Sequence, residues 1–139
     1  MSWDVMIMHI TGEITDIEEI TEDQVIPLGS KHTVIDRLRS LFPDGDFRDS
    51  AWGTLEREHY FIEFNIGSEE EIDSIMLHIR GGDDAIEVLR IINEETGWTL
   101  IDDGEGIIDF ADHPEKGFQK WQQYRDQVMK DMHEDDTKS

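Results

Sequence analysis

One histidine and three polar side chains are the residues of this sequence that come nearest to a reactive site. If the strands expected over residues 60–66 and 72–80 pair, an open sheet face carries Glu63, Asn65, His78 and Arg80. A histidine beside a carboxylate can move a proton or supply two ligands to a metal ion. No third ligand is visible, and half-exposed sheet faces carry such residues without any function. These four residues are therefore the candidate site of an alternative interpretation, a small enzyme or small-ligand-binding domain.

Two other patterns fail as reactive sites. The run Arg80–Asp84 contains two glycines at a strand-to-helix junction, where backbone N–H groups can bind phosphate. Its two aspartates would occupy the place of the anion, and no Lys-Ser or Lys-Thr pair follows. Gly29-Ser30 and Gly67-Ser68 lack the Gly-x-Ser-x-Gly elbow of a serine nucleophile. Tight turns and helix caps explain these residues better.

Metal and cofactor motifs are also missing from the sequence. Loops counted from Asp44 and Asp103 lack the oxygen ligands that an EF-hand needs at its fixed positions. The six histidines contain no i, i+4 pair, and there is no cysteine to bind zinc, form a disulfide or act as a nucleophile. The sequence predicts no catalytic residue, no metal and no cofactor, and it favours a non-enzyme.

Charge is the strongest signal in the composition. Thirty-four Asp and Glu face twelve Lys and Arg over 139 residues, which gives a formal net charge of −22. Such a charge repels nucleic acid and anionic membranes and attracts basic proteins. We therefore expect a non-catalytic acidic binding protein, an immunity-type protein or another inhibitor of a basic protein partner. Nucleic acid and membrane are excluded as partners, and monomer and homodimer stay open.

Acidic clusters on two expected turns are the candidate binding residues. Acids on turns are free to project toward a partner, and one cluster lies beside a tryptophan, although burial in the core is a competing explanation for that ring. The candidates are Glu69, Glu70, Glu71, Trp98, Asp102, Asp103 and Glu105.

The absence of targeting signals favours the cytoplasm. The chain has no cysteine, as suits a reducing compartment, and its first residues lack a basic region and a small-residue cleavage site. No apolar run approaches the roughly 20 residues that span a bilayer.

Hydrophobic periodicity predicts an α+β fold. Apolar residues alternate in six segments and recur at helical spacing in three, the first helix capped by Ser30 and the second opened by Asp84 and closed by Gly97. Strands are expected over 3–9, 51–57, 60–66, 72–80, 98–101 and 107–110, and helices over 31–42, 84–96 and 112–132. Short turns between strands favour a mostly antiparallel sheet of five to six strands with helices on one face, a two-layer sandwich. The order resembles the split βαβ arrangement of ferredoxin-like folds with one extra strand.

The chain reads as one domain. Residues 1–132 carry the periodic segments, and no linker or internal repeat divides them. Residues 133–139 form a polar, acidic stretch that we expect to be disordered.

Several short motifs resemble a family of small uncharacterised bacterial cytosolic proteins. They are Pro27-Leu28-Gly29-Ser30, Phe42-Pro43, Ser50-Ala51-Trp52-Gly53-Thr54-Leu55-Glu56, Ile62-Glu63-Phe64-Asn65-Ile66-Gly67 and Leu77-His78-Ile79-Arg80-Gly81-Gly82-Asp83-Asp84-Ala85. The resemblance covers about residues 2 to 110 and implies a fold but no activity. In size, charge and class the chain is also similar to the small acidic immunity proteins that protect bacteria from secreted toxins.

Overall fold

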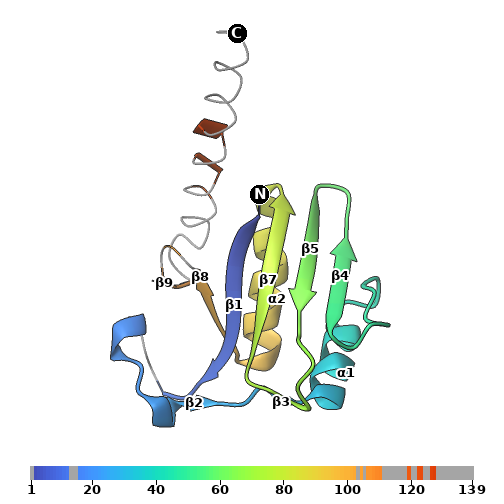
Figure 1. Cartoon of the computed structure of the whole chain (residues 1–139). Coiled ribbons are helices and arrows are strands. Elements are labelled where there is room, and N and C mark those ends of the chain that lie inside the picture. The colour runs from blue at the N-terminus through green and yellow to red at the C-terminus, as the bar shows by residue number, and fades with distance from the viewer. Residues whose placement is uncertain are drawn as a thin grey trace, which may run out of the picture.

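In a computed structural model, the described part of the chain forms a mostly antiparallel seven-stranded sheet with two α-helices packed on one face (Figure 1). The structure describes residues 2–12, 16–102, 104, 106–110, 119, 122–123 and 126–127, with only the backbone of Asp83. The fold class predicted from the sequence is confirmed. The third helix expected over 112–132 and the tail over 133–139 lie almost wholly outside the described residues.

The strands of the main sheet run in the order β4-β5-β7-β1-β8-β9, with β2 paired to the far end of β1. Their bounds are β1 (Trp3–Ile10), β2 (Val25–Ile26), β4 (Trp52–Glu56), β5 (Tyr60–Asn65), β7 (Ser74–Gly81), β8 (Thr99–Asp102) and β9 (Gly106–Ile107). A second, two-stranded sheet joins β3 (Gly29–Ser30) to β6 (Glu71–Ile72). The short strands β2, β3 and β6 were missed by the sequence analysis, because two-residue strands have no periodicity to detect.

The central strands have the split βαβ arrangement that the sequence predicted. Strand β1 lies between β7 and β8 and is antiparallel to both, and β5 is antiparallel to β7. Helix α1 (Lys31–Leu41) follows β1 and helix α2 (Ile86–Thr96) follows β7. The extra strand is β4, which lies at the edge of the sheet beyond β5.

The core lies between the sheet and the two helices. Alternate residues of each long strand point to this side, such as Val5 and Ile7 in β1, and each helix turns one apolar stripe toward them. Leu41 is half-buried and packs against this core. The other apolar residues of these faces are buried, among them Val5, Ile7, Val34, Leu38, Ile62, Phe64, Ile75, Leu77, Val88, Leu89 and Ile92.

Two of the three predicted helix caps are confirmed. The Ser30 hydroxyl accepts a hydrogen bond from the backbone N–H of Thr33, and Gly97 ends α2 in the left-handed region at φ 75°. The cap predicted at Asp84 is wrong. Ala85 is instead the N-cap of α2, at the end of a 3₁₀ turn over residues 83–85, and no side chain caps the helix.

The chain before α1 is more structured than expected. Two single turns, η1 (Ile17–Glu19) and η2 (Glu22–Gln24), lead into β2, and the carbonyl of Gln24 accepts a bond from the backbone N–H of Thr11. The carboxylate of Asp16 caps η1. The strand expected over 72–80 is also interrupted at Asp73, so that Ile72 pairs with Gly29 in the second sheet while Ser74 pairs with Met8 in the first.

Candidate functional site

The open face of the sheet, opposite the helices, carries the residues of the alternative interpretation. Strand register places Glu63 and Asp4 on either side of His78. The His78 imidazole Nδ1 lies 2.8 Å from the Asp4 carboxylate, and the Trp52 indole stacks on the His78 ring with centroids 5.9 Å apart. The Arg80 guanidinium donates to the Glu63 carboxylate. Strand pairing therefore brings three of the four predicted side chains together.

For two residues of this face the structure differs from the sequence-based prediction. Asp4, the partner of His78, was missed, although its position between the inward-facing Trp3 and Val5 indicated the open face. Asn65 lies one step along the strand, opposite Met76 rather than His78, and is exposed.

The titratable side chains of this face form two pairs with each other. The carboxylate of Glu63 faces the cation of Arg80, and the carboxylate of Asp4 faces His78. The hydroxyl of Ser2 donates to Asp4 at 2.7 Å rather than to the imidazole, so that it is not held as a nucleophile against a base. The arrangement orients the side chains of an exposed sheet.

A different set of residues gathers at one end of the molecule. The arm of residues 16–26 carries Asp16, Glu18, Glu19, Glu22 and Asp23, and the turn of residues 67–73 carries Glu69, Glu70, Glu71 and Asp73. All nine carboxylate side chains are exposed. The arm and the turn lie at the same end because β3, just after the arm, pairs with β6 inside the turn (Figure 1). We call these nine residues the acidic end.

The carboxylates of the acidic end have no ion-pair partner among the described residues, whereas several described carboxylates elsewhere do. Elsewhere, described arginines pair with carboxylates, as in Arg57 with Asp44, Arg48 with Asp46 and Arg80 with Glu63. Among the described residues, none of the nine carboxylates of the acidic end forms an ion pair. These nine carboxylates are therefore held by no ion pair on the described surface, although Lys31 lies near one of them, Glu70.

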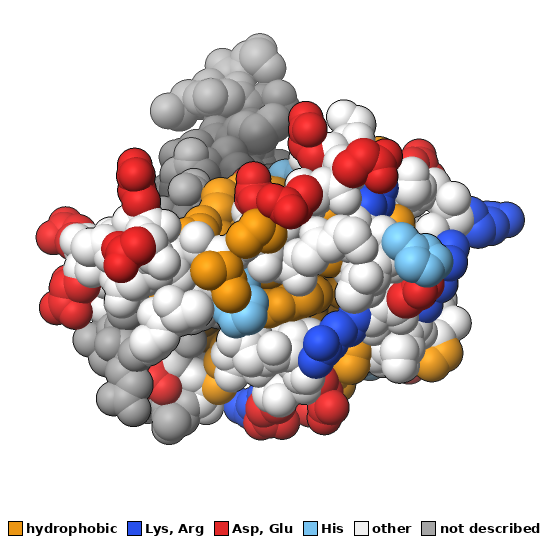
Figure 2. All heavy atoms as spheres, turned by 90° about the horizontal axis from the view of Figure 1, so that it is seen from below, with side chains coloured by type: hydrophobic (Ala, Val, Ile, Leu, Met, Phe, Trp, Pro, Cys, Tyr) orange, Lys and Arg blue, Asp and Glu red, His pale blue; other side chains and the backbone are white. Residues whose placement is uncertain are grey.

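Hydrophobic side chains lie within the same end. Ile17 and Ile26 of the arm are 46% and 37% exposed. Seen from this end, a central group of hydrophobic side chains has acidic side chains on several sides, with a His and a Lys or Arg side chain directly beside it (Figure 2). An apolar centre with a charged rim is the usual composition of a protein-binding surface.

Two of the predicted binding residues are structural. Trp98 is 3% exposed, which confirms burial in the core as the explanation for this ring, and Asp102 is 6% exposed, so neither is free to meet a partner. The Arg37 guanidinium lies 5.9 Å from the Trp98 ring centroid. The Asp102 carboxylate accepts bonds from the Trp3 indole N–H and from the backbone N–H of Gly104. Burial with two donors, rather than projection from a turn, explains this acid.

The remaining predicted binding residues divide into two groups. Glu69, Glu70 and Glu71 are exposed as expected and belong to the acidic end. Asp103 and Glu105 lie outside the described residues. The arm of residues 16–26 was not among the predicted binding residues, although its run of acids without a single Lys or Arg was the signal that could have identified it.

Electrostatic pairing is strongest away from the acidic end. Hydrogen bonding to the Arg57 guanidinium holds the pKa of Asp44 below its ordinary value, and the same bond raises the pKa of Arg57. Arg57 also donates to the Tyr60 hydroxyl. A bidentate contact with Arg48 lowers the pKa of Asp46 to about 2. These pairs keep the carboxylates ionised and oriented on the protein itself.

Comparisons with protein-family models, with curated proteins and with solved structures found no match for the chain. In the part that the structure describes, no helix is long and apolar enough to cross a membrane. Within the same residues, no three His, Asp or Glu side chains cluster in a way that could hold a metal ion. The interpretation of function therefore rests on the geometry and charge of the described surface.

Proposed function

We propose that this protein is a non-catalytic binding protein that recognises a basic protein through its acidic end. The observation that carries the proposal is the set of nine exposed carboxylates without an ion pair among the described residues. Unpaired like charges repel one another, and a cationic surface relieves that repulsion when it docks. The binding surface is thus ready for a partner of opposite charge.

Charge on its own gives speed and selectivity rather than tight binding. A negative surface accelerates encounter with a basic protein and disfavours nucleic acid, since phosphate backbones repel it. The exposed Ile17 and Ile26 supply the apolar contact that charge alone cannot. The expected partner therefore has a basic rim around an apolar patch.

This activity is that of an immunity-type protein or another inhibitor that covers a basic protein. In the proposal the protein acts in the cytoplasm, as its lack of cysteine suits. The open sheet face has no part in it, since Glu63 and His78 are each held by a neighbour on that face.

A charge-neutralised variant of the turn tests the proposal. In this variant Glu69, Glu70 and Glu71 are all changed to Gln, which removes three charges without altering side-chain size. The matched control changes Glu56, Glu58 and Glu87 to Gln, three exposed acids near the opposite end of the sheet (Figure 1). Wild type and both variants serve as bait with extracts of the source cell.

The expected result is a basic protein retained by wild type and by the control but lost from the turn variant. Association of that protein with the turn variant should be slower by about tenfold or more. Equal retention by the turn variant, or a captured protein without a basic surface, would contradict the proposal.

A further inference from the structure

A hollow beside α1 carries a local excess of cations in an otherwise acidic molecule. It encloses about 300 Å³, at the small end of the range for ligand pockets. Lys31, Arg39 and Arg48 line it together with His32, so that three of the seven described Lys and Arg side chains meet at one place. Two carboxylates, those of Asp36 and Glu70, also reach its wall.

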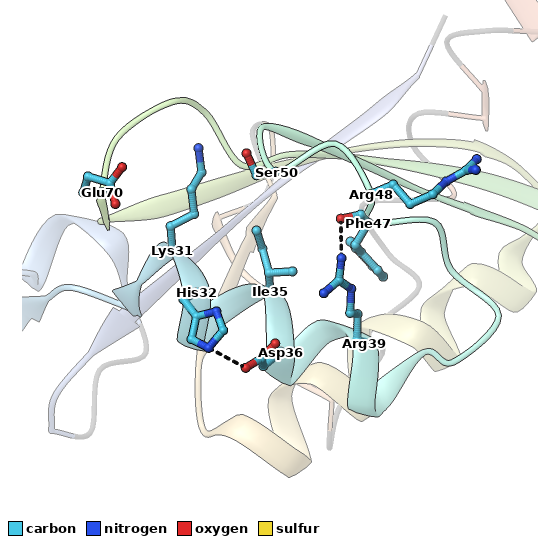
Figure 3. Close-up of a pocket in the computed structure, with 9 residues that line it drawn as sticks. All are labelled: Lys31, His32, Ile35, Asp36, Arg39, Phe47, Arg48, Ser50 and Glu70. Atoms are coloured by element: carbon cyan, nitrogen blue, oxygen red, sulfur yellow. Dashed lines mark hydrogen bonds and ion pairs between the residues drawn. The ribbon is translucent and has the colours of Figure 1, made fainter.

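Helical spacing explains how the hollow is built. Lys31, Ile35 and Arg39 are four residues apart and lie along one stripe of α1. Ile35 lies between the two cations in Figure 3, and Phe47, from the segment after the helix, adds an apolar wall. Both apolar side chains are buried, at 7% and 2% exposure. The hollow is therefore lined by two apolar side chains and by a row of positively charged ones.

The donors of this stripe are only partly used. The Lys31 ammonium and the Ser50 hydroxyl have no hydrogen-bond or ion-pair partner among the described residues. The Arg39 guanidinium donates one hydrogen bond to the carbonyl of Phe47, at 3.0 Å. Because a guanidinium has five N–H donors, others remain for a ligand. Donors remain for a ligand at both ends of the stripe.

One of the two carboxylates that line the hollow is paired with a neighbouring side chain. Asp36 pairs with His32 at 3.1 Å, one helical turn along the neighbouring stripe of α1 (Figure 3). Arg48 is likewise held by Asp46 outside the hollow. Lys31 and Arg39 are left as the cations that face the space above Ile35.

We propose that this hollow binds a small organic anion, whose carboxylate or phosphate contacts Lys31 and Ser50 while its apolar part lies on Ile35 and Phe47, toward Arg39. The proposal goes beyond the binding of a basic protein, because the ligand has the opposite charge and the residues that bind it are on α1. Glu70 is shared by the two surfaces, and its charge disfavours the anion while favouring the basic protein.

The test is a titration of the protein with four probes, followed by the backbone amide signals in NMR spectra at low salt. The probes are benzoate, phenyl phosphate, inorganic phosphate and the neutral benzamide. Benzoate or phenyl phosphate should shift the amides of residues 31–36 and 47–50 in a saturable way. Benzamide should not, and inorganic phosphate should bind at least about tenfold more weakly, because it has no apolar part.

Variants separate this site from general attraction to cations. Lys31→Ala and Ser50→Asp should each weaken binding by about tenfold or more, since a charge-assisted contact is lost or a negative charge is added. Arg90→Ala, which removes the same charge from a half-buried residue of α2 that pairs with Glu87, should leave the affinity unchanged. The amide spectra of the variants themselves show that each is folded.

Glu70→Gln distinguishes this proposal from the proposed function. It should strengthen anion binding through the loss of a like charge and weaken binding of the basic protein. Either effect can fail without the other. Equal shifts with benzamide, equal affinity of Lys31→Ala and wild type, or no localised shift up to about 20 mM probe would each overturn the anion site.

Discussion

At the scale of single residues, burial decides which carboxylates hold the fold together. Asp102 is nearly inaccessible and accepts a 2.8 Å bond from the Trp3 indole and a 2.7 Å bond from the Gly104 backbone N–H. We predict that Asp102→Ala lowers the free energy of unfolding by about 1–3 kcal/mol, because buried donors lose their acceptor. Urea unfolding measures this loss. An unchanged free energy of unfolding together with impaired partner binding would contradict this structural role and would assign Asp102 to the binding surface.

Asp44 is a residue-scale case in which the pH dependence can be stated. The Arg57 guanidinium lowers the pKa of Asp44. The pair therefore stabilises the fold fully at pH values above the unfolded-state pKa of about 4. This stabilisation is lost as the pH falls through the lower folded-state pKa. Because the pair is partly exposed, Asp44→Asn should cost less than about 1 kcal/mol at neutral pH. Unfolding curves from about pH 6 to about pH 2.5 should converge for variant and wild type. A stability difference between variant and wild type that grows as the pH falls would contradict this prediction.

At the scale of elements, α1 couples the core to the surface. Leu38 is fully buried under the sheet, while Lys31 and Arg39 of the same helix face the hollow. Leu38→Ala should lower the free energy of unfolding by about 2–5 kcal/mol, through lost contacts and the cavity left behind. Denaturant unfolding measures it, with the exposed Ser40→Ala as the matched control. A loss below about 0.5 kcal/mol would mean that the buried stripe of α1 is assigned wrongly.

The elements also show how far the sequence could predict this molecule. Long periodic segments were recognisable, since the stripe of Val34 and Leu38 and the alternation of Val5 and Ile7 are local signals. The two-residue strands were not, because β3 and β6 exist only through pairing with each other. The pair of Asp4 with His78 depends on register between strands 74 residues apart, which no local pattern reveals. Only part of the acidic end could be predicted for the same reason. The turn of residues 67–73 was a candidate from its sequence, but its spatial neighbour, the arm of residues 16–26, is placed there by strand pairing.

At the scale of the whole molecule, the charge of −22 acts against the folded state. Added salt screens the repulsion within the acidic end, where the Debye length falls from about 30 Å at 0.01 M to about 10 Å at 0.1 M. We therefore predict that Tm rises by several degrees over this range, as differential scanning calorimetry would show. The turn variant with three Gln residues should start from a higher Tm and gain less. A salt-independent Tm would mean that the carboxylates are already offset.

The whole-molecule account depends most on how the acidic end meets its partner. The decisive measurement is the association rate constant with the captured basic protein, followed by stopped flow across a range of salt concentrations, for wild type, the turn variant and the Glu56/Glu58/Glu87 control. The wild-type and control association rates should fall steeply as salt rises, while the turn variant starts slower and responds less. The dissociation rates should change little. Identical salt dependence for the turn variant and the control would contradict this expectation, because the acidic end would then have no special place in recognition.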